Sequence, residues 1–229
     1  MKRLTAYLLP TALLALSACN SNDPSDPAEN NVEWNIVTYE GTENSVSTFT
    51  YQLLNDSPLI TLTAEGKPTT PLDKGQRLLA GYINPTPGES NKVTIKAMAK
   101  TFGPELLEIE RQPASMGDAI YVASVWRTGK WLNLHAAINT SNGDTNGKVT
   151  LSVDKATIGN DYPDLYVIYK PSDQGTELIQ KDAYGSWDIE SVWQLESTKG
   201  LIVHFYSLNV PSNQQKLDKD VAAEITPES

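Results

Sequence analysis

The chain has few of the side chains that build disulfides and metal sites. Its single cysteine is Cys19, and its two histidines are His135 and His204. One cysteine cannot form a disulfide within the chain, so packing must hold the fold together. The two histidines are far apart in sequence and lack the spacing of a ligand pair. We therefore expect no metal ion and no cofactor.

Signals of nucleophilic catalysis are also scarce. A serine nucleophile needs a histidine placed to take its proton, and the chain has no Gly-x-Ser-x-Gly run. His135 alternates with Leu132 and Leu134, which predicts a solvated position on an outer strand face. His204 alternates with Ile202, which predicts partial burial beside a hydrogen-bonding partner. We predict no catalytic residue and a protein that is not an enzyme.

Long apolar runs are absent, and the most apolar stretch lies near the N-terminus. This stretch, 7–16, is shorter than the roughly 20 residues that a membrane-spanning helix needs. Lys2 and Arg3 precede it, and Leu16-Ser17-Ala18-Cys19 follows it. A basic start, an apolar middle and small residues at the end are typical of a secretory signal.

The cysteine directly after the small residues makes this signal resemble a bacterial lipobox. The resemblance implies removal of residues 1–18 as a signal peptide, acylation of Cys19 and attachment to the membrane through its acyl chains. A plain secretory signal with an incidental cysteine is the alternative. Asn20 stands where an aspartate would mark inner-membrane retention, which favours the outer membrane and leaves open the face on which the protein sits.

Basic side chains are outnumbered, with 18 lysines and arginines against 28 aspartates and glutamates, giving a net charge of −10. Such a surface repels nucleic acid, which binds proteins largely through phosphate contacts with lysine and arginine. It also repels anionic lipid head groups. We expect no nucleic-acid partner, a membrane contact made only by the lipid, and a monomer.

The residues after Cys19 divide into tails and a β-rich middle. Residues 19–31 contain no large apolar side chain and predict a flexible tether; residues 214–229 predict a disordered tail. Between them, alternating apolar and polar residues predict strands separated by Gly and Pro turns. Five strands within 32–111 predict a small barrel of the OB type. Their expected ranges are 33–39, 46–54, 59–63, 77–83 and 92–98.

Residues 112–213 predict an antiparallel β-sandwich, so the expected fold class is all-β: a small OB-like barrel followed by a sandwich. In 187–195, Trp187, Ile189 and Trp193 are expected on one strand face. Residues 105–109 fit either a strand or a short helix. The expected sandwich strands are 120–126, 131–138, 149–153, 165–169, 177–180, 187–195 and 201–208.

The order of these features resembles the NigD-like lipoproteins of the Bacteroidetes. The matching stretches are Asp73-Lys74-Gly75-Gln76-Arg77-Leu78-Leu79, Asp118-Ala119-Ile120, Trp131-Leu132-Asn133-Leu134 and the pair 189–195 and 201–208. The resemblance implies a lipobox, a tether, an OB-like domain and a β-sandwich. It also implies a loose association with bacteriocin operons, and it supplies no catalytic residues.

Trp126 and Trp131 are the candidate ligand contacts. They flank the turn at 127–130, so they could face each other across a hairpin. A buried aromatic pair of this kind stabilises a sheet by about 0.2–1 kcal/mol, whereas an exposed pair could stack on a sugar or a peptide.

The run 142–147 resembles the first half of a calcium loop. Val153 stands where the final acidic ligand belongs, so we interpret the run as a turn.

We expect a non-enzymatic, lipid-anchored envelope protein that binds an unidentified envelope protein or glycan. One alternative is carbohydrate binding or weak glycan hydrolysis through Trp126, Trp131 and nearby acids. Another is protection against a secreted peptide, on the family resemblance alone.

Overall fold

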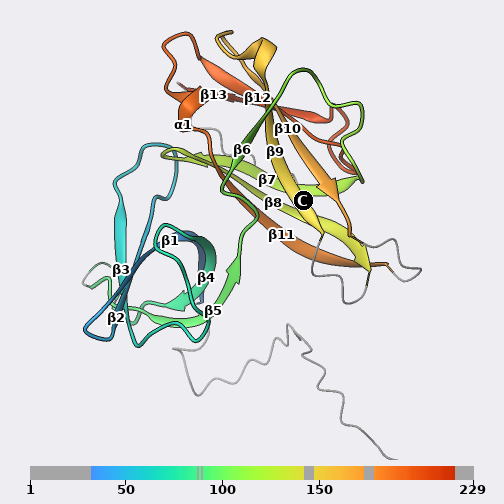
Figure 1. Ribbon diagram of the computed structural model, residues 1–229. Helices are drawn as coiled ribbons and strands as arrows, with labels where there is room; N and C mark the ends of the chain where they lie inside the picture. Colours follow the sequence, from blue (N-terminus) through green and yellow to red (C-terminus); the bar gives the residue numbers. More distant parts are fainter. Residues whose placement is uncertain (1–31, 87, 89, 142–146, 173–177, 220–229) are drawn as a thin grey trace, which may run out of the picture.

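The protein consists almost entirely of β-strands arranged in two parts (Figure 1). The computed structural model describes residues 32–86, 88, 90–141, 147–172 and 178–219. The predicted signal peptide, Cys19 and the tether at 19–31 lie outside the described residues, as do 142–146 and 220–229. The predicted all-β fold, an OB-like barrel followed by a sandwich, is confirmed.

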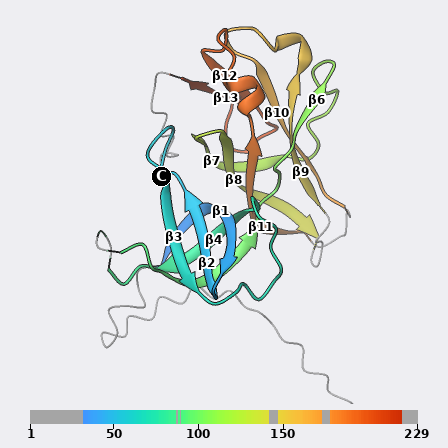
Figure 2. The ribbon, with the colours of Figure 1, turned by 60° about the vertical axis from the view of Figure 1, so that its left-hand side comes forward.

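The first five strands form one antiparallel sheet in the order β3-β2-β1-β4-β5. They are β1 (Glu33–Glu43), β2 (Val46–Tyr51), β3 (Ile60–Glu65), β4 (Arg77–Ile83) and β5 (Thr94–Lys100). The sheet is strongly curled, as Figure 2 shows, and backbone hydrogen bonds join its two ends. There the Thr63 amide donates to Asn91 O at 2.9 Å, and the Val93 amide donates to Thr63 O at 2.8 Å. These bonds close the small barrel that the OB type requires.

Alternation along the strands gives the barrel its own apolar core. In β2, Phe49 and Tyr51 are buried, while Thr48 before them is only partly covered. Thr50 between them is also buried, and its Oγ1 donates to Glu40 Oε1 at 2.8 Å. The buried core residues are Val37, Tyr39, Phe49, Tyr51, Leu62, Ala64, Leu78, Ala80, Tyr82 and Val93.

The remaining strands form a sandwich of two sheets. A five-stranded sheet has the order β13-β12-β10-β9-β6, and a three-stranded sheet has the order β11-β8-β7. The strands are β6 (Leu106–Ile109), β7 (Ile120–Thr128), β8 (Trp131–Ser141), β9 (Lys148–Asp154), β10 (Asp164–Lys170), β11 (Leu178–Asp188), β12 (Gly200–His204) and β13 (Gln214–Asp218).

The sandwich encloses a second, separate apolar core. Leu132, Leu134 and Ala136 of β8 face Leu151 and Val167 and their neighbours from the opposite sheet. Trp187 is fully buried in this core, and its ring lies so close to Gly185 that a Cβ there would sit 2.0 Å from the indole. The absence of a side chain at Gly185 therefore makes room for the largest core residue.

The prediction of one strand over 187–195 is wrong. Strand β11 ends at Asp188, and Glu190–Trp193 forms the short helix α1. Asp188 Oδ1 accepts the Glu190 amide at 3.0 Å, which favours a helical turn at this point. Ile189 and Val192 are buried and Trp193 is partly buried, so the apolar residues follow a helical spacing.

The predicted boundaries also need correction at two strands. The tail predicted from residue 214 begins with β13, which pairs with β12. Gln215 occupies a buried position there, and its Nε2 donates to Val125 O at 3.1 Å, so polar residues form a strand that hydrophobicity did not reveal. The predicted boundary at residue 111 places β6 with the barrel, but β6 pairs with β9 of the sandwich.

Within the described residues, no helix has the length and apolar character needed to cross a membrane.

Candidate functional site

The barrel packs on the outer face of the three-stranded sheet β11-β8-β7. On β8, Trp131, Asn133 and His135 alternate with the core residues Leu132 and Leu134, so they point away from the sandwich core. Side chains from β1 and β4 of the barrel meet this face. The junction between the two parts is therefore built from polar and aromatic residues.

Arg77 of β4 is the central polar side chain of the junction. It is only 6% exposed. Its Nε donates to Ser186 Oγ at 2.9 Å, its Nη1 to Thr38 Oγ1 at 3.0 Å and its Nη2 to Asn133 Oδ1 at 3.3 Å. Its Cζ also lies 4.8 Å from the ring centroid of Trp131, within cation–π range. Three neutral acceptors and an aromatic ring thus hold a buried cation.

Burial lowers the pKa of Arg77 from its usual 12.5 to about 10. The guanidinium remains charged at neutral pH because this pKa still lies well above 7. The acceptors around it are themselves fixed, since Ser186 Oγ donates to Asn133 Oδ1 at 2.8 Å and Asn133 Nδ2 donates to Thr128 Oγ1 at 2.9 Å. The network thus links the barrel to the sandwich through a hydrogen-bonded platform.

A second arginine crosses the junction in the opposite direction. Arg127 of β7 donates from Nη1 to Asp56 Oδ1 at 2.8 Å and from Nη2 to Asp56 Oδ2 at 2.6 Å. The hydrogen bond from Arg127 lowers the pKa of Asp56 below its usual range. The Asn55 amide also donates to Arg127 O at 2.8 Å, so the β2–β3 connection is held against the end of β7.

Beside this platform lies a groove of about 240 Å³, which we call the junction groove. It takes residues from β1, β4, β7, β8, β11 and the segment after β2. Its lining consists of Trp34, Asn35, Ile36, Gln52, Leu53, Leu79, Trp126, Thr128, Asn133, His135 and Tyr184. Three of these residues, Trp34, Trp126 and Tyr184, carry large aromatic rings.

Trp34 is the most exposed of the three rings, at 54%. Its indole lies on Gly81 of the neighbouring strand β4, where an added Cβ would stand 2.7 Å from the ring. Gly81 therefore lets the indole lie flat against the barrel. The alternation of residues along β1 does not predict the position of the Trp34 ring, because that position depends on Gly81 of the neighbouring strand β4.

The structure separates the two tryptophans predicted as ligand contacts. Trp126 stands opposite Asn133 and Trp131 stands opposite Thr128, so the two are diagonal neighbours on one sheet face and not a directly facing pair. Trp126 lines the junction groove. Trp131 is partly covered, with Arg77 Cζ at 4.8 Å and Lys130 Nζ at 5.0 Å from its ring centroid. Ligand contact by either residue stays a prediction.

His135 and Tyr184 form the opposite wall of the groove. They are cross-strand partners, their rings stack with centroids 4.4 Å apart, and His135 Nε2 lies 3.0 Å from Asp182 Oδ1. Burial, and secondarily the charge of Asp182, raises the pKa of Tyr184, which keeps its hydroxyl protonated. The wall therefore offers an aromatic face and a hydroxyl donor.

His204 lies on the sandwich, in the five-stranded sheet. It is partly buried, its Nε2 is 2.6 Å from Asp164 Oδ1, and it stacks on Tyr166 with centroids 4.8 Å apart. The predicted partial burial with a hydrogen-bonding partner is confirmed. The described residues contain no group of three histidine, cysteine or acidic side chains placed to hold a metal ion.

No family model and no curated protein sequence matches this chain. Solved structures of Bacteroidetes proteins do match its fold. A NigD-like immunity protein of Bacteroides caccae aligns with a TM-score of 0.59 and 14% identity, over 86% of this chain and 98% of that chain.

Two further structures agree with this match. A predicted toxin-related protein of Parabacteroides distasonis has a TM-score of 0.57 and 14% identity, over 83% of this chain and 95% of that one. A predicted lipoprotein of Bacteroides fragilis has a TM-score of 0.54 and 14% identity, over 84% of this chain and 100% of that one. The resemblance inferred from the sequence is thus confirmed at the level of structure: this chain has the fold of the NigD-like proteins.

Proposed function

We propose that this chain is a lipid-anchored protein of the cell envelope that binds a neutral carbohydrate in the junction groove without chemically altering it. One observation carries the proposal: Trp34, Trp126 and Tyr184 meet in a single groove together with amide side chains. Small-molecule sites combine apolar and aromatic walls with a few polar groups that fix orientation.

The size of the groove and the net charge of the chain restrict the kinds of ligand that could bind. At about 240 Å³ it is smaller than the roughly 300–1,000 Å³ of typical ligand pockets, so it fits one ring of a longer chain. The net charge of −10 disfavours anionic polymers. A neutral glycan, with apolar ring faces and hydroxyls, matches both constraints.

Polar groups around the rings are available for hydroxyls. Asn35 Nδ2 donates to Tyr82 Oη at 2.9 Å, and Gln52 Nε2 donates to Ser57 O at 2.7 Å. These bonds hold the two amide side chains in place. A ligand would meet side chains that are already held in place, which lowers the entropy cost of binding.

The membrane anchor in this proposal is Cys19. The lipobox-like run before it supports acylation, and a predicted lipoprotein is among the proteins that share the fold. Replacing Cys19 with serine is expected to move the folded protein from the membrane fraction to the soluble fraction. Retention of Cys19→Ser in membranes would contradict the anchor.

The binding proposal is tested on an array of neutral glycans with the wild-type protein, Trp34→Ala and Tyr121→Ala. Trp34→Ala removes an exposed ring from the groove, whereas Tyr121→Ala removes an exposed ring from β7 outside it. A large apolar side chain contributes about 1.5–3 kcal/mol when fully covered, so Trp34→Ala should weaken binding about tenfold or more. Tyr121→Ala should bind like wild type. Equal binding by all three proteins, or binding by none, refutes the proposal.

A second candidate function is protection of the producing cell against a secreted toxin. It is favoured by the names of two proteins with this fold, one described as an immunity protein and one as toxin-related. Deleting the gene should then increase sensitivity to the toxin of a neighbouring strain. Unchanged sensitivity across a panel of such strains removes this candidate.

A further inference from the structure

Strand β5 (Thr94–Lys100) pairs along only one of its two edges. It lies at the end of the barrel sheet, next to β4. The barrel closes just before β5, where Val93 and Asn91 bond to Thr63. Among the described residues, no backbone hydrogen bond joins the other edge of β5 to another segment. The backbone donors and acceptors on this edge are therefore open to a further strand.

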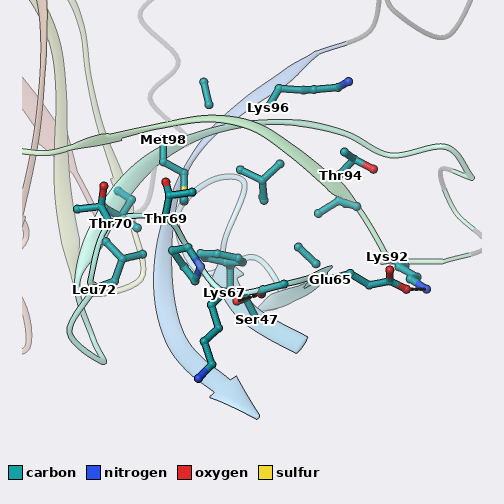
Figure 3. Close-up of a pocket in the computed structure, with 18 of the residues that line it drawn as sticks. Ser47, Glu65, Lys67, Thr69, Thr70, Leu72, Lys92, Thr94, Lys96 and Met98 are labelled. Atoms are coloured by element: carbon teal, nitrogen blue, oxygen red, sulfur yellow. Dashed lines mark hydrogen bonds and ion pairs between the residues drawn. The ribbon is translucent and has the colours of Figure 1, made fainter. Parts of the chain in front are cut away.

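A cavity of about 860 Å³ runs along this open edge, and it is larger than the junction groove. It is bounded by β5 on one side and by the connection 66–70 with Leu72 on the other (Figure 3). In Figure 3, Met98 points from β5 toward Thr69 across the cavity. The cavity therefore lies between β5 and the connection 66–70.

The interior of this cavity is apolar. Phe49, Leu78 and Val93 of the barrel core form its floor, and Ile95 and Met98 are partly buried beside them. Strand β5 spans seven residues, or about 23 Å at the usual rise per residue. The space accommodates an extended segment whose alternate side chains enter an apolar floor.

The rim of the cavity is positively charged, in contrast to the chain as a whole. Lys67, Lys92, Lys96 and Lys100 line it, with Glu65 as the only acidic residue of the lining. Glu65 is already neutralised by Lys92, whose Nζ lies 2.7 Å from Glu65 Oε1. Lys67 and Lys96 extend outward from the cavity (Figure 3), where they can meet charges on a bound segment.

We propose that the open edge of β5 binds an extended acidic peptide of a partner protein by strand addition. Backbone hydrogen bonds to β5 supply affinity, as in other complexes formed by adding a strand to a sheet edge. The apolar floor receives every second side chain, and the lysines select acidic residues at the alternate positions. This site is separate from the junction groove and does not depend on carbohydrate binding.

Charge and backbone pairing argue against three other occupants. Lysines on an edge strand oppose pairing with a second copy of that strand, because like charges would face each other. The net charge of −10 opposes nucleic acid. An anionic acyl chain could use the lysines and the apolar floor, but it would leave the open backbone groups of β5 unpaired.

The test uses the full chain and two fluorescent peptides, one alternating Glu and Val and one alternating Lys and Val. Fluorescence anisotropy measures affinity, and amide hydrogen exchange measures protection of β5. The Glu peptide is expected to bind more weakly as salt is added, and to slow exchange of the amides at 94–100. The Lys peptide is expected not to bind.

Two double variants that each replace two lysines with glutamates compare the cavity with another part of the surface. The double variant Lys67→Glu/Lys96→Glu removes two exposed ion pairs with the Glu peptide, so it should weaken binding of that peptide by about two- to thirtyfold. Lys148→Glu/Lys170→Glu makes the same charge change on the exposed sandwich surface and should bind like wild type.

Three results would overturn the inference. The first is failure of the Glu peptide to bind. The second is equal weakening by the two double variants, which would indicate an effect of net charge alone. The third is binding of laurate at the same cavity without protection of the β5 amides by either ligand, which would indicate an acyl-chain site.

Discussion

Replacing Arg77 with methionine tests whether the buried cation holds the barrel and the sandwich together. Methionine keeps much of the side-chain length but removes all three hydrogen bonds to Ser186, Thr38 and Asn133. It also removes the cation–π contact with Trp131. We expect the variant to fold with a lower free energy of unfolding.

The size of the effect follows from two opposing contributions. A hydrogen bond to a charged group stabilises a fold by about 1.5–3 kcal/mol, and Arg77 donates three. Burying the charge of Arg77 opposes this stabilisation, and methionine carries no charge to bury. The lowering of the Arg77 pKa to about 10 corresponds to a cost of about 3 kcal/mol. Asn133 and Ser186 remain bonded to each other, so neither is left without a partner. The expected net loss is about 2–5 kcal/mol.

Urea denaturation followed by circular dichroism measures this loss. The slope for a chain of this size lies toward the upper end of the usual range, at about 2–3 kcal/mol per molar urea, so the midpoint should fall by roughly 0.7–2.5 M. The control is Arg111→Met, which removes an exposed arginine from the β6–β7 connection and should change stability by less than about 0.5 kcal/mol. Equal midpoints for the two variants would refute the argument that Arg77 couples the two parts.

Two further predictions address the junction. Asp56 has a lowered pKa in the folded state because Arg127 donates to it, so its stabilising contribution is present above its usual 3.8 and is lost as the pH falls through the lowered value. The urea midpoint of Asp56→Asn should therefore lie below that of wild type at neutral pH and approach it in strong acid; a constant gap would contradict this. Gly81→Ala places a Cβ 2.7 Å from the Trp34 ring and should displace the indole, shifting its fluorescence emission and weakening glycan binding; an unchanged spectrum would contradict the packing.

Much of the barrel follows from local sequence, whereas the junction does not. The strand predicted over 77–83 matches β4, because its apolar run lies between clear turn signals. The tail strand β13 was missed because Gln215 fills a buried position through a hydrogen bond to a distant carbonyl. The junction groove combines Trp34, Trp126 and Tyr184 from three strands in both parts of the fold. No periodicity within one strand predicts that these three residues meet. Trp126 of the predicted pair lines the groove, and its contact with a ligand stays a prediction.

The long separation between Arg77 and Ser186, 109 residues along the chain, has a consequence for biogenesis. A chain made from its N-terminus completes the five barrel strands before β11 exists, so the Arg77 guanidinium must stay hydrated on an unfinished surface. Docking of the barrel can be completed only after β11 has been synthesised and has joined its sheet. Until β11 has been made, the barrel therefore presents an exposed, cationic half of the interface to solvent.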